Sequence, residues 1–332
     1  MGDGRGNDGR TLADVSEAQL LELILPLLAG GPEVAVGPGD DAAVIEPVGA
    51  LVVTTDAMVR GRDWRDEWSG PADVGAKAVA QNLADVAAMG ARPTGLLVTL
   101  VADPATALEW VTTFARGLGD AARRVGVPVL GGDLSSAPSG TLVVSVTALG
   151  ALDGRGPVLR SGAHVGDAVA VAGTLGLAAA GWRLLESGRP GADPGAVDIQ
   201  RCPRPPLEQG PAAAAAGATA MIDLSDGLLR DADRVARASG VRFDLDSAAL
   251  AGDVARLHPA LGADLALECV LTGGEEHSLL ASFPGAVPGG WRRVGTVREG
   301  SGVTLDGTRQ PPRGWDHFAT GSPSPAPAGP AC

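Results

Sequence analysis

The sequence predicts an α+β fold arranged in two domains. Its 332 residues are enough to bury two hydrophobic cores. Short apolar runs rich in Val and Leu alternate irregularly with helical stretches in both halves, which favours α+β over a regular βαβ array. A Gly-rich segment at residues 153–166, which also carries Pro157, marks a boundary near residue 152. The predicted domains are therefore residues 11–152 and 153–320, and residues 1–10 and 321–332 are expected to be disordered.

In the first domain, the pattern predicts an opening helix, five strands and two more helices. The opening helix spans residues 11–28, because Leu20, Ile24 and Leu28 recur on one face with Leu21 and Leu25. The remaining elements follow from apolar periodicity. The strands are expected at residues 42–45, 51–55, 95–101, 128–130 and 141–149, and the helices at residues 71–89 and 104–125.

The second domain is expected to open with a strand at residues 168–172 and a helix at residues 175–187. A Pro- and Gly-rich stretch at residues 188–206 predicts a loop. An Ala-rich helix at residues 209–217 follows, and mixed structure continues to about residue 318. No short internal repeat is visible.

Charge and composition exclude several classes of protein. The net charge of −13 disfavours a nucleic-acid surface, which needs a basic footprint. Lys77 is the only lysine, so the chain has no Walker A loop and no protein-kinase lysine. Apolar stretches stay well below the ~20 residues that a bilayer requires, and no secretory signal is present, so a cytoplasmic location is expected. Three cysteines lack metal-ligand or redox spacing.

A series of aspartates carries most of the functional signal. Each lies beside a glycine or apolar strand, or on a helix face, where hard oxygen ligands for Mg²⁺ could converge. For any one of them alone, a routine turn or helix cap is the better explanation, but the set favours a site with several ions. The aspartates are Asp40, Asp41, Asp56, Asp85, Asp133, Asp223 and Asp226.

Electrostatics indicates how such a set would be used. An acidic protein that presents clustered aspartates would repel ATP, which carries a charge of roughly −4, unless divalent ions lay between them. Thr54 and Thr55 offer further oxygen atoms, and Gly132 allows the backbone to approach a phosphate. Asn82 and Asp85 share a face of the predicted helix, as a site or as a buried hydrogen-bonded pair.

Several motifs along residues 12–318 follow one another in the order seen in thiamine-monophosphate kinases, so the chain resembles that family. The motifs lie at residues 37–45, 54–56, 77–90, 131–133, 160–167, 222–228, 271–277 and 314–318. The resemblance implies the two-domain fold of the aminoimidazole ribonucleotide synthetase superfamily, with an N-terminal α/β domain whose sheet dimerises and a C-terminal α/β domain. It also implies a homodimer, ATP as co-substrate, several Mg²⁺ ions and direct transfer of phosphate to thiamine monophosphate, giving thiamine diphosphate.

The resemblance also implies roles for individual residues. Asp85, Asp133 and Asp226 would be catalytic, and nucleotide would contact Gly132, Asp133, Arg160 and Ser225. Glu275 and Trp315 would contact the acceptor, together with Asp63, which stands where the family usually has a histidine. The implied magnesium ligands are Asp40, Asp41, Thr54, Thr55, Asp56, Asp85, Asp133, Asp223 and Asp226, with the choice between Asp40 and Asp41 open.

Departures from the family pattern leave other functions open. Asp63 and Cys202 depart from the family pattern where the acceptor is expected to bind, and the chain has no tyrosine for the aromatic contacts that the family often makes. A diverged paralogue could therefore phosphorylate another small phosphomonoester or alcohol. Aminoimidazole ribonucleotide synthetase, selenophosphate synthetase and the hydrogenase-maturation dehydratase of the same superfamily also use ATP. The last two usually need a reactive cysteine or a C-terminal cysteine tail, and Cys332 lies in a Pro-, Ala- and Ser-rich tail without the expected partner motif. An acidic metal-binding scaffold is the non-enzymatic alternative, and Arg160 and Ser225 argue against it.

Overall fold

The computed structural model describes residues 9–28, 34–36, 44–45 and 49–315. By its internal contacts the chain divides into two units. Unit 1 comprises Met1–Pro47, Val53–Asn82 and Thr94–Leu149, and unit 2 comprises Val48–Val52, Leu83–Pro93 and Gly150–Cys332. Each unit contains both helices and strands, which confirms the predicted α+β class.

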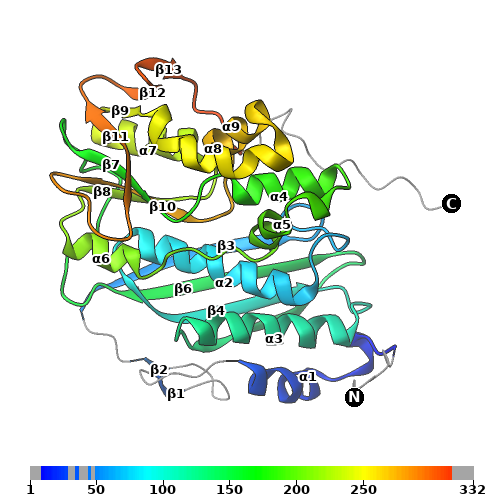
Figure 1. The fold of residues 1–332 in the computed structure, drawn as a ribbon. Coiled ribbons are helices and arrows are strands. Elements are labelled where there is room, and N and C mark those ends of the chain that lie inside the picture. Colours follow the sequence, from blue (N-terminus) through cyan, green and yellow to red (C-terminus); the bar gives the residue numbers. More distant parts are fainter. Residues whose placement is uncertain (1–8, 29–33, 37–43, 46–48, 316–332) are drawn as a thin grey trace. The chain divides into compact units, whose positions relative to one another are not determined.

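A four-stranded sheet in the order β3-β6-β4-β5 dominates the first part of the chain (Figure 1). Its strands β4 and β5 are parallel. The even-numbered side chains of β4 and β6 are mostly buried, whereas odd-numbered positions are partly exposed. The elements here are η1 (Leu12–Asp14), α1 (Glu17–Ile24), η2 (Leu25–Leu27), β1 (Val34–Val36), β2 (Val44–Ile45), β3 (Leu51–Val59), α2 (Pro71–Ala88), β4 (Arg92–Ala102), α3 (Leu108–Arg124), β5 (Val129–Ser136) and β6 (Leu142–Ala151).

The second sheet has seven strands in the order β13-β12-β9-β11-β7-β10-β8. Every residue of β7, β8 and β10 is buried, which agrees with the mostly apolar runs that form these strands. The elements of this unit are β7 (Ala168–Ala172), α4 (Leu177–Glu186), η3 (Pro190–Ala192), α5 (Pro194–Arg201), α6 (Gln209–Ala215), β8 (Ala220–Leu224), α7 (Leu228–Ser239), β9 (Arg242–Leu245), α8 (Ser247–Leu261), α9 (Ala263–Thr272), β10 (Ser278–Phe283), β11 (Arg292–Arg298), β12 (Gly302–Leu305) and β13 (Thr308–Gln310).

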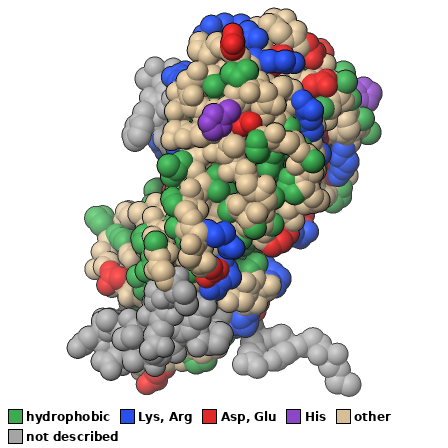
Figure 2. Space-filling view, turned by 90° about the vertical axis from the view of Figure 1, so that its left-hand side faces the viewer, with side chains coloured by type: hydrophobic (Ala, Val, Ile, Leu, Met, Phe, Trp, Pro, Cys, Tyr) green, Lys and Arg blue, Asp and Glu red, His purple; other side chains and the backbone are tan. Residues whose placement is uncertain are grey.

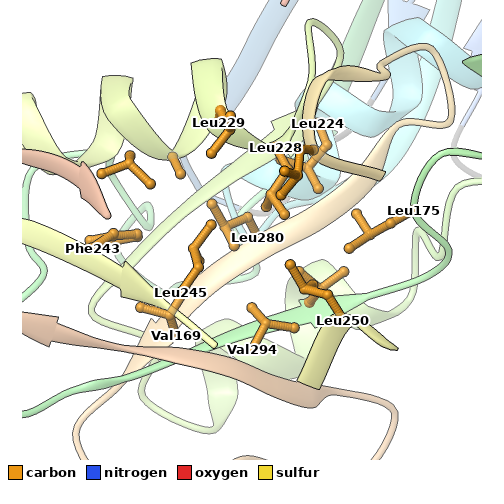
Figure 3. Packing of buried hydrophobic residues seen from close by; sticks show 14 of the residues in the cluster. Val169, Leu175, Leu224, Leu228, Leu229, Phe243, Leu245, Leu250, Leu280 and Val294 are labelled. Carbon is orange, nitrogen blue, oxygen red and sulfur yellow. The ribbon is translucent and has the colours of Figure 1, made fainter. Parts of the chain in front are cut away.

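One hydrophobic core holds the helices of unit 2 against its sheet. Leu228 and Leu229 of α7 meet Phe243 of β9 and Leu280 of β10 in this core (Figure 3). Leu224 at the end of β8 belongs to the same cluster. Burying each such side chain contributes about 1.5–3 kcal/mol, so the end of β8 and the start of α7 are firmly placed. The loop between them therefore has two fixed ends.

The opening helix predicted at residues 11–28 is wrong as a single element. It consists of η1, α1 and η2, because Ser16 and Gln19 form a capping box that starts a new helix at Glu17. Pro26 then stops regular helical hydrogen bonding after Ile24. The predicted loop at residues 188–206 is also wrong in part, since Asp193 caps a helix, α5, that has Pro194 at its first position.

Three aspartates that the sequence places beside a glycine or an apolar strand lie inside strands. Strand β3 continues to Val59 and strand β5 to Ser136, so Asp56 and Asp133 are strand residues. Asp223 is the fourth residue of the buried strand β8. The physical reason is that backbone pairing continued past the apolar runs. Asp133, for example, pairs with Thr99 in the parallel ladder between β4 and β5.

Candidate functional site

The loop of Ser225, Asp226 and Gly227 is the centre of the candidate site in unit 2. It joins the buried strand β8 to helix α7. Asp223, two residues before the loop, is only 3% exposed although it is a carboxylate. Ser225 and Asp226 are partly exposed, so their side chains reach the surface of the unit. The sequence therefore presents a buried acid and two accessible polar residues at one strand end.

The carbonyl groups of this loop bind two residues that are distant in sequence. The backbone N–H of Glu275 donates to the Ser225 carbonyl at 3.0 Å, and the N–H of Trp315 donates to the Asp226 carbonyl at 2.9 Å. A Cβ atom on Gly274 would lie 1.9 Å from the Ser225 carbonyl oxygen, and one on Gly314 would lie 2.2 Å from that of Asp226. Only glycine permits these approaches, which explains the glycine that precedes each predicted acceptor residue.

The segment Gly273–His277 has a strained backbone. Glu275 and His277 have positive φ angles of 68° and 54°, which side chains rarely adopt and which cluster at functional sites. Glu276 lies between them and is buried. Its carboxylate accepts N–H groups from the start of α4: Gly176 at 2.9 Å, Ala178 at 3.2 Å, and Leu177. This anchor leaves Glu275 exposed and turns His277 inward.

His277 connects Asp223 with two other predicted site residues. Its Nδ1 lies 3.1 Å from Asp223 Oδ2, and because a carboxylate only accepts, Nδ1 is the donor. Burial alone would lower the pKa of His277, whereas the hydrogen bond to Asp223 and the charge of that carboxylate raise it. The charges of Glu275 and Asp85 act in the same direction, and the pKa lies above its ordinary value. Asp223 therefore bonds this imidazole directly, and the charges of Asp85 and Glu275 act on the same ring.

Asp226 is held by arginines of helix α7. Its Oδ2 lies 2.5 Å from Arg234 Nη2 and 3.9 Å from Arg230 Nε. Arg234 also bonds the fully buried Asp231 through Nη1 at 2.5 Å. Burial, assisted by the charge of Asp223, raises the pKa of Asp231 to about 7. A cation that takes Asp226 as a ligand would therefore share this carboxylate with Arg234 or displace the arginine from it.

In unit 1, the predicted magnesium ligands Thr54, Thr55 and Asp56 lie on β3, an edge strand of the four-stranded sheet. The Thr55 hydroxyl donates to the Val146 carbonyl at 3.0 Å and accepts from Thr147. The backbone N–H of Asp56 donates to Asn82 Oδ1 at 3.1 Å, and Asn82 Nδ2 donates to the Ala78 carbonyl at 2.9 Å. Asn82 thus orients the strand at Asp56, while the Asp56 side chain stays exposed.

Gly132 and Asp133 lie on β5, the opposite edge strand of the same sheet. Ser135 Oγ donates to Asp133 Oδ2 at 2.9 Å. Two strands separate β3 from β5, and strands are about 4.8 Å apart, so the backbones that carry Asp56 and Asp133 are about 14 Å apart across the sheet. One Mg²⁺ ion, with ligands at about 2.1 Å, cannot take both carboxylates from the same sheet.

Two other predicted contacts have local structural roles as well. Asp63 Oδ2 accepts the backbone N–H of Val59 at 2.7 Å, which directs this carboxylate into the turn after β3. The Arg160 side chain is exposed, and Ser239 accepts the N–H groups of Gly162 and Ala163 and donates to the Arg160 carbonyl. The Arg160 loop is therefore tied to the end of α7. Asp40 and Asp41 lie outside the described residues.

Within the described part of the chain, no group of three or more His, Cys, Asp or Glu side chains could by itself hold a metal ion. Mg²⁺ commonly keeps several waters and binds through one or two carboxylates plus the phosphates of a substrate. The candidate donors of unit 2, Asp85, Asp223 and Asp226, are hard oxygen ligands of this kind. They fit an ion shared with a phosphate rather than a closed protein cage.

Comparison with known proteins identifies the family. The family described as AIR synthase related protein, N-terminal domain, matches residues 39–152. A thiamine-monophosphate kinase of Mycobacterium tuberculosis (strain H37Rv) is 44% identical over 93% of each chain. The chain belongs to the thiamine-monophosphate kinase family. A thiamine-monophosphate kinase of Escherichia coli K12 is 33% identical over 87% of this chain and 93% of its own.

Solved structures agree with that assignment. Thiamine-monophosphate kinase from Stenotrophomonas maltophilia superposes with a TM-score of 0.76 at 31% identity, over 89% of this chain and 98% of its own. AaThiL complexed with AMPPCP and TMP gives 0.74 at 30% identity, over 92% and 98%. The hydrogenase maturation protein HypE, at 19% identity and a TM-score of 0.72, shares the fold. The predicted family and its superfamily fold are confirmed.

Among the described helices, none has the length and apolar character needed to cross a membrane. On the face seen in Figure 2, acidic and basic side chains are interspersed and form no continuous basic patch.

Sequence reasoning missed four residues that organise the site: His277, Asp231, Arg234 and Ser239. His277 ends the motif at residues 271–277, and its place beside two acidic residues is the available signal. Asp231 could have been found from its position, because acidic residues are favoured in the first turn of a helix. Arg234 and Ser239 carried none, because only the fold brings them to Asp226 and Arg160.

Proposed function

We propose that this protein transfers the γ-phosphoryl group of ATP to the phosphate of thiamine monophosphate, giving ADP and thiamine diphosphate. One observation carries the proposal. The loop Ser225–Gly227 contains Ser225, which is predicted to contact nucleotide. Its carbonyl groups accept backbone hydrogen bonds from Glu275 and Trp315, which are predicted to contact the acceptor. Thiamine-monophosphate kinases at 44% and 33% identity, and AaThiL complexed with AMPPCP and TMP, support the same reaction.

The proposed chemistry needs no strong general base. The acceptor oxygen belongs to a phosphate that is already largely ionised at neutral pH, so catalysis depends on positioning and charge neutralisation. Ser225 and Asp226 would place the nucleotide side of the loop. Arg160, in its loop fixed by Ser239, would bind a phosphate oxygen. In unit 1, Gly132 would let the backbone approach a phosphate closely.

Magnesium would be held with the phosphates by Asp85, Asp223 and Asp226 in unit 2. In unit 1, Thr54, Thr55, Asp56 and Asp133 are the proposed ligands, and Asp40 or Asp41 belongs to the same proposal. When bound, Mg²⁺ supplies neutralisation of the charge that develops on the transferred group. Asp85, Asp133 and Asp226 are the residues whose loss should affect turnover most.

The acceptor would be recognised between an aromatic ring and a carboxylate. Trp315 is 37% exposed and its backbone is bonded to the loop, and the proposed contact is stacking of its ring on the acceptor. An indole face attracts a cationic ring such as a thiazolium, and the exposed Glu275 adds a complementary charge. Asp63 remains a proposed contact, although its carboxylate already serves the turn at Val59.

The same proposal includes a homodimer formed through the four-stranded sheet. One face of that sheet leaves Val53 60%, Val59 39% and Leu97 39% exposed. Apolar side chains that the described residues leave exposed on one sheet face indicate a protein partner. A second copy of the chain presents the same face and would cover it symmetrically. The predicted cytoplasmic location, where ATP and Mg²⁺ are abundant, can be tested by cell fractionation.

The deciding experiment separates the acceptors. Purified protein is incubated with Mg-ATP and either thiamine monophosphate or thiamine, and the products are resolved by chromatography. Thiamine diphosphate formed only from the monophosphate is the expected result. Nucleotide binding without either product would refute the assigned acceptor and would favour a paralogue that acts on another small phosphomonoester or alcohol.

A further inference from the structure

Asp231 is a buried carboxylate that the reaction outlined above does not use. It lies in the first turn of α7 and has 0% exposure. Its Oδ2 accepts the backbone N–H groups of Asp226 and Gly227, each at 3.0 Å. Its Oδ1 accepts from Arg234 Nη1 at 2.5 Å. Both oxygens of a single side chain are therefore committed to the Ser225–Gly227 loop or to its partner.

The loop is held from two sides. From inside, Asp231 binds its N–H groups, while from outside Glu275 and Trp315 donate to its carbonyl groups. Arg234 closes the arrangement, because its other nitrogen binds Asp226 Oδ2 at 2.5 Å. A displacement of this loop would therefore move the side chains predicted for the nucleotide and the backbones of both acceptor residues together.

We propose that Asp231 is a positioning residue that fixes the Ser225–Gly227 loop and thereby sets the spacing between the nucleotide and the acceptor. The proposal rests on the proposed function, because that function assigns Ser225 and Asp226 to nucleotide and metal, and Glu275 and Trp315 to the acceptor. Asp231 touches neither ligand and acts through the loop.

The competing explanation is that Asp231 only stabilises the start of α7. An acidic side chain in the first turn of a helix, bonded to free N–H groups, is a common stabilising device. Helix α7 offers a matched control in Asp233, which is 8% exposed and pairs with Arg237 at 2.5 Å. Asp233 is a buried aspartate on the same helix with an arginine partner, and no described hydrogen bond joins it to the loop.

The experiment compares Asp231→Asn with Asp233→Asn in the full chain. The amide introduced by Asp231→Asn could accept one backbone N–H through its oxygen, but its nitrogen would face Arg234, so the loop would lose part of its anchor. Hydrogen exchange of the amides of Asp226 and Gly227, the Kd of AMPPCP with Mg²⁺, and the KM and kcat for thiamine monophosphate are measured for each protein. If Asp231→Asn does not fold, Arg234→Lys replaces it as the test variant, because Arg234 is only partly buried.

We expect Asp231→Asn to lose protection at both amides and to raise the Kd of AMPPCP and the KM for thiamine monophosphate by about tenfold each. Asp233→Asn should change either constant by less than about twofold at a similar loss of stability. Arg234→Lys should shift the same constants in the same direction by a smaller factor. Equal effects of the two aspartate variants, or unchanged protection in Asp231→Asn, would overturn the proposal.

The readouts separate this proposal from the proposed function. Exchange protection and AMPPCP binding require no acceptor. If the unaltered protein forms no thiamine diphosphate, the proposed function fails, and the exchange and nucleotide data alone still decide whether Asp231 fixes the loop. If product forms and Asp231→Asn behaves like Asp233→Asn, the positioning role fails while the proposed function stands.

Discussion

The stability of unit 2 should depend on pH through Glu276. Burial raises the pKa of this carboxyl from 4.5 to about 8, against the lowering effect of the three N–H groups of α4 that it accepts. Because the folded state holds its proton more tightly than the unfolded state, the stability contributed is greatest at low pH. It is lost as the pH rises from about 4.5 towards about 8.

The magnitude follows from the two pKa values. Between them the folded state carries one more proton than the unfolded state, so the free energy of unfolding falls by about 1.4 kcal/mol per pH unit. From about pH 5.5 to about pH 7.5 the loss integrates to about 2.5 kcal/mol. Glu276→Gln, an uncharged side chain of the same shape, lacks this loss.

The assay is urea unfolding followed by tryptophan fluorescence at several pH values between these limits. Trp291, which packs edge-on against Phe283 of β10 at 5.3 Å, reports on the same unit. Asp231 titrates in the same direction in both proteins, so subtracting the Glu276→Gln curve isolates Glu276. A difference between the two proteins that stays constant with pH would refute the reasoning, because it would mean that Glu276 is ionised throughout.

Three further outcomes follow from the geometry. Asp85→Asn should lower turnover by about a hundredfold with an unchanged unfolding midpoint, and near-normal turnover would remove Asp85 from the site. Gly132→Ala should destabilise the protein by about 1–3 kcal/mol in urea unfolding, because a Cβ atom there would lie 1.8 Å from the Val98 carbonyl oxygen. Val53→Arg should convert a dimer to a monomer in light scattering, and a dimer that persists would exclude this sheet face as the interface.

The sequence predicted the regular parts of the fold well. Strand β7 was located at Ala168–Ala172 from a run of small apolar residues, and helix α2 was placed within one residue of its end. The errors arose where a local signal competed with periodicity. Ser16 and Pro26 divided one predicted helix, and Asp193 with Pro194 began a helix inside a segment that composition marked as a loop.

The candidate site was less accessible to sequence reasoning. Asp85, Asp223 and Glu275 could be singled out as acidic residues in recognisable motifs, but their common neighbour His277 appears only when α2, β8 and the loop before β10 are brought together. The same limit applies to Asp56 and Asp133. Their motifs indicate two metal ligands but say nothing of their arrangement, and the strand order puts them on opposite edge strands of one sheet.

The pairing of Asp226 with Arg234 bears on how a metal-bridged nucleotide could bind. Clustered aspartates repel one another, and here Arg234 on α7 pairs with Asp226 while the imidazole of His277 is hydrogen-bonded to Asp223. Mg²⁺ binding at Asp226 must therefore displace or share an existing ion pair, which lowers the affinity for the metal alone. Nucleotide phosphate could offset that cost by giving Arg234 another anionic partner. Metal and nucleotide should consequently bind cooperatively at this loop, because each compensates for the partner that the other removes.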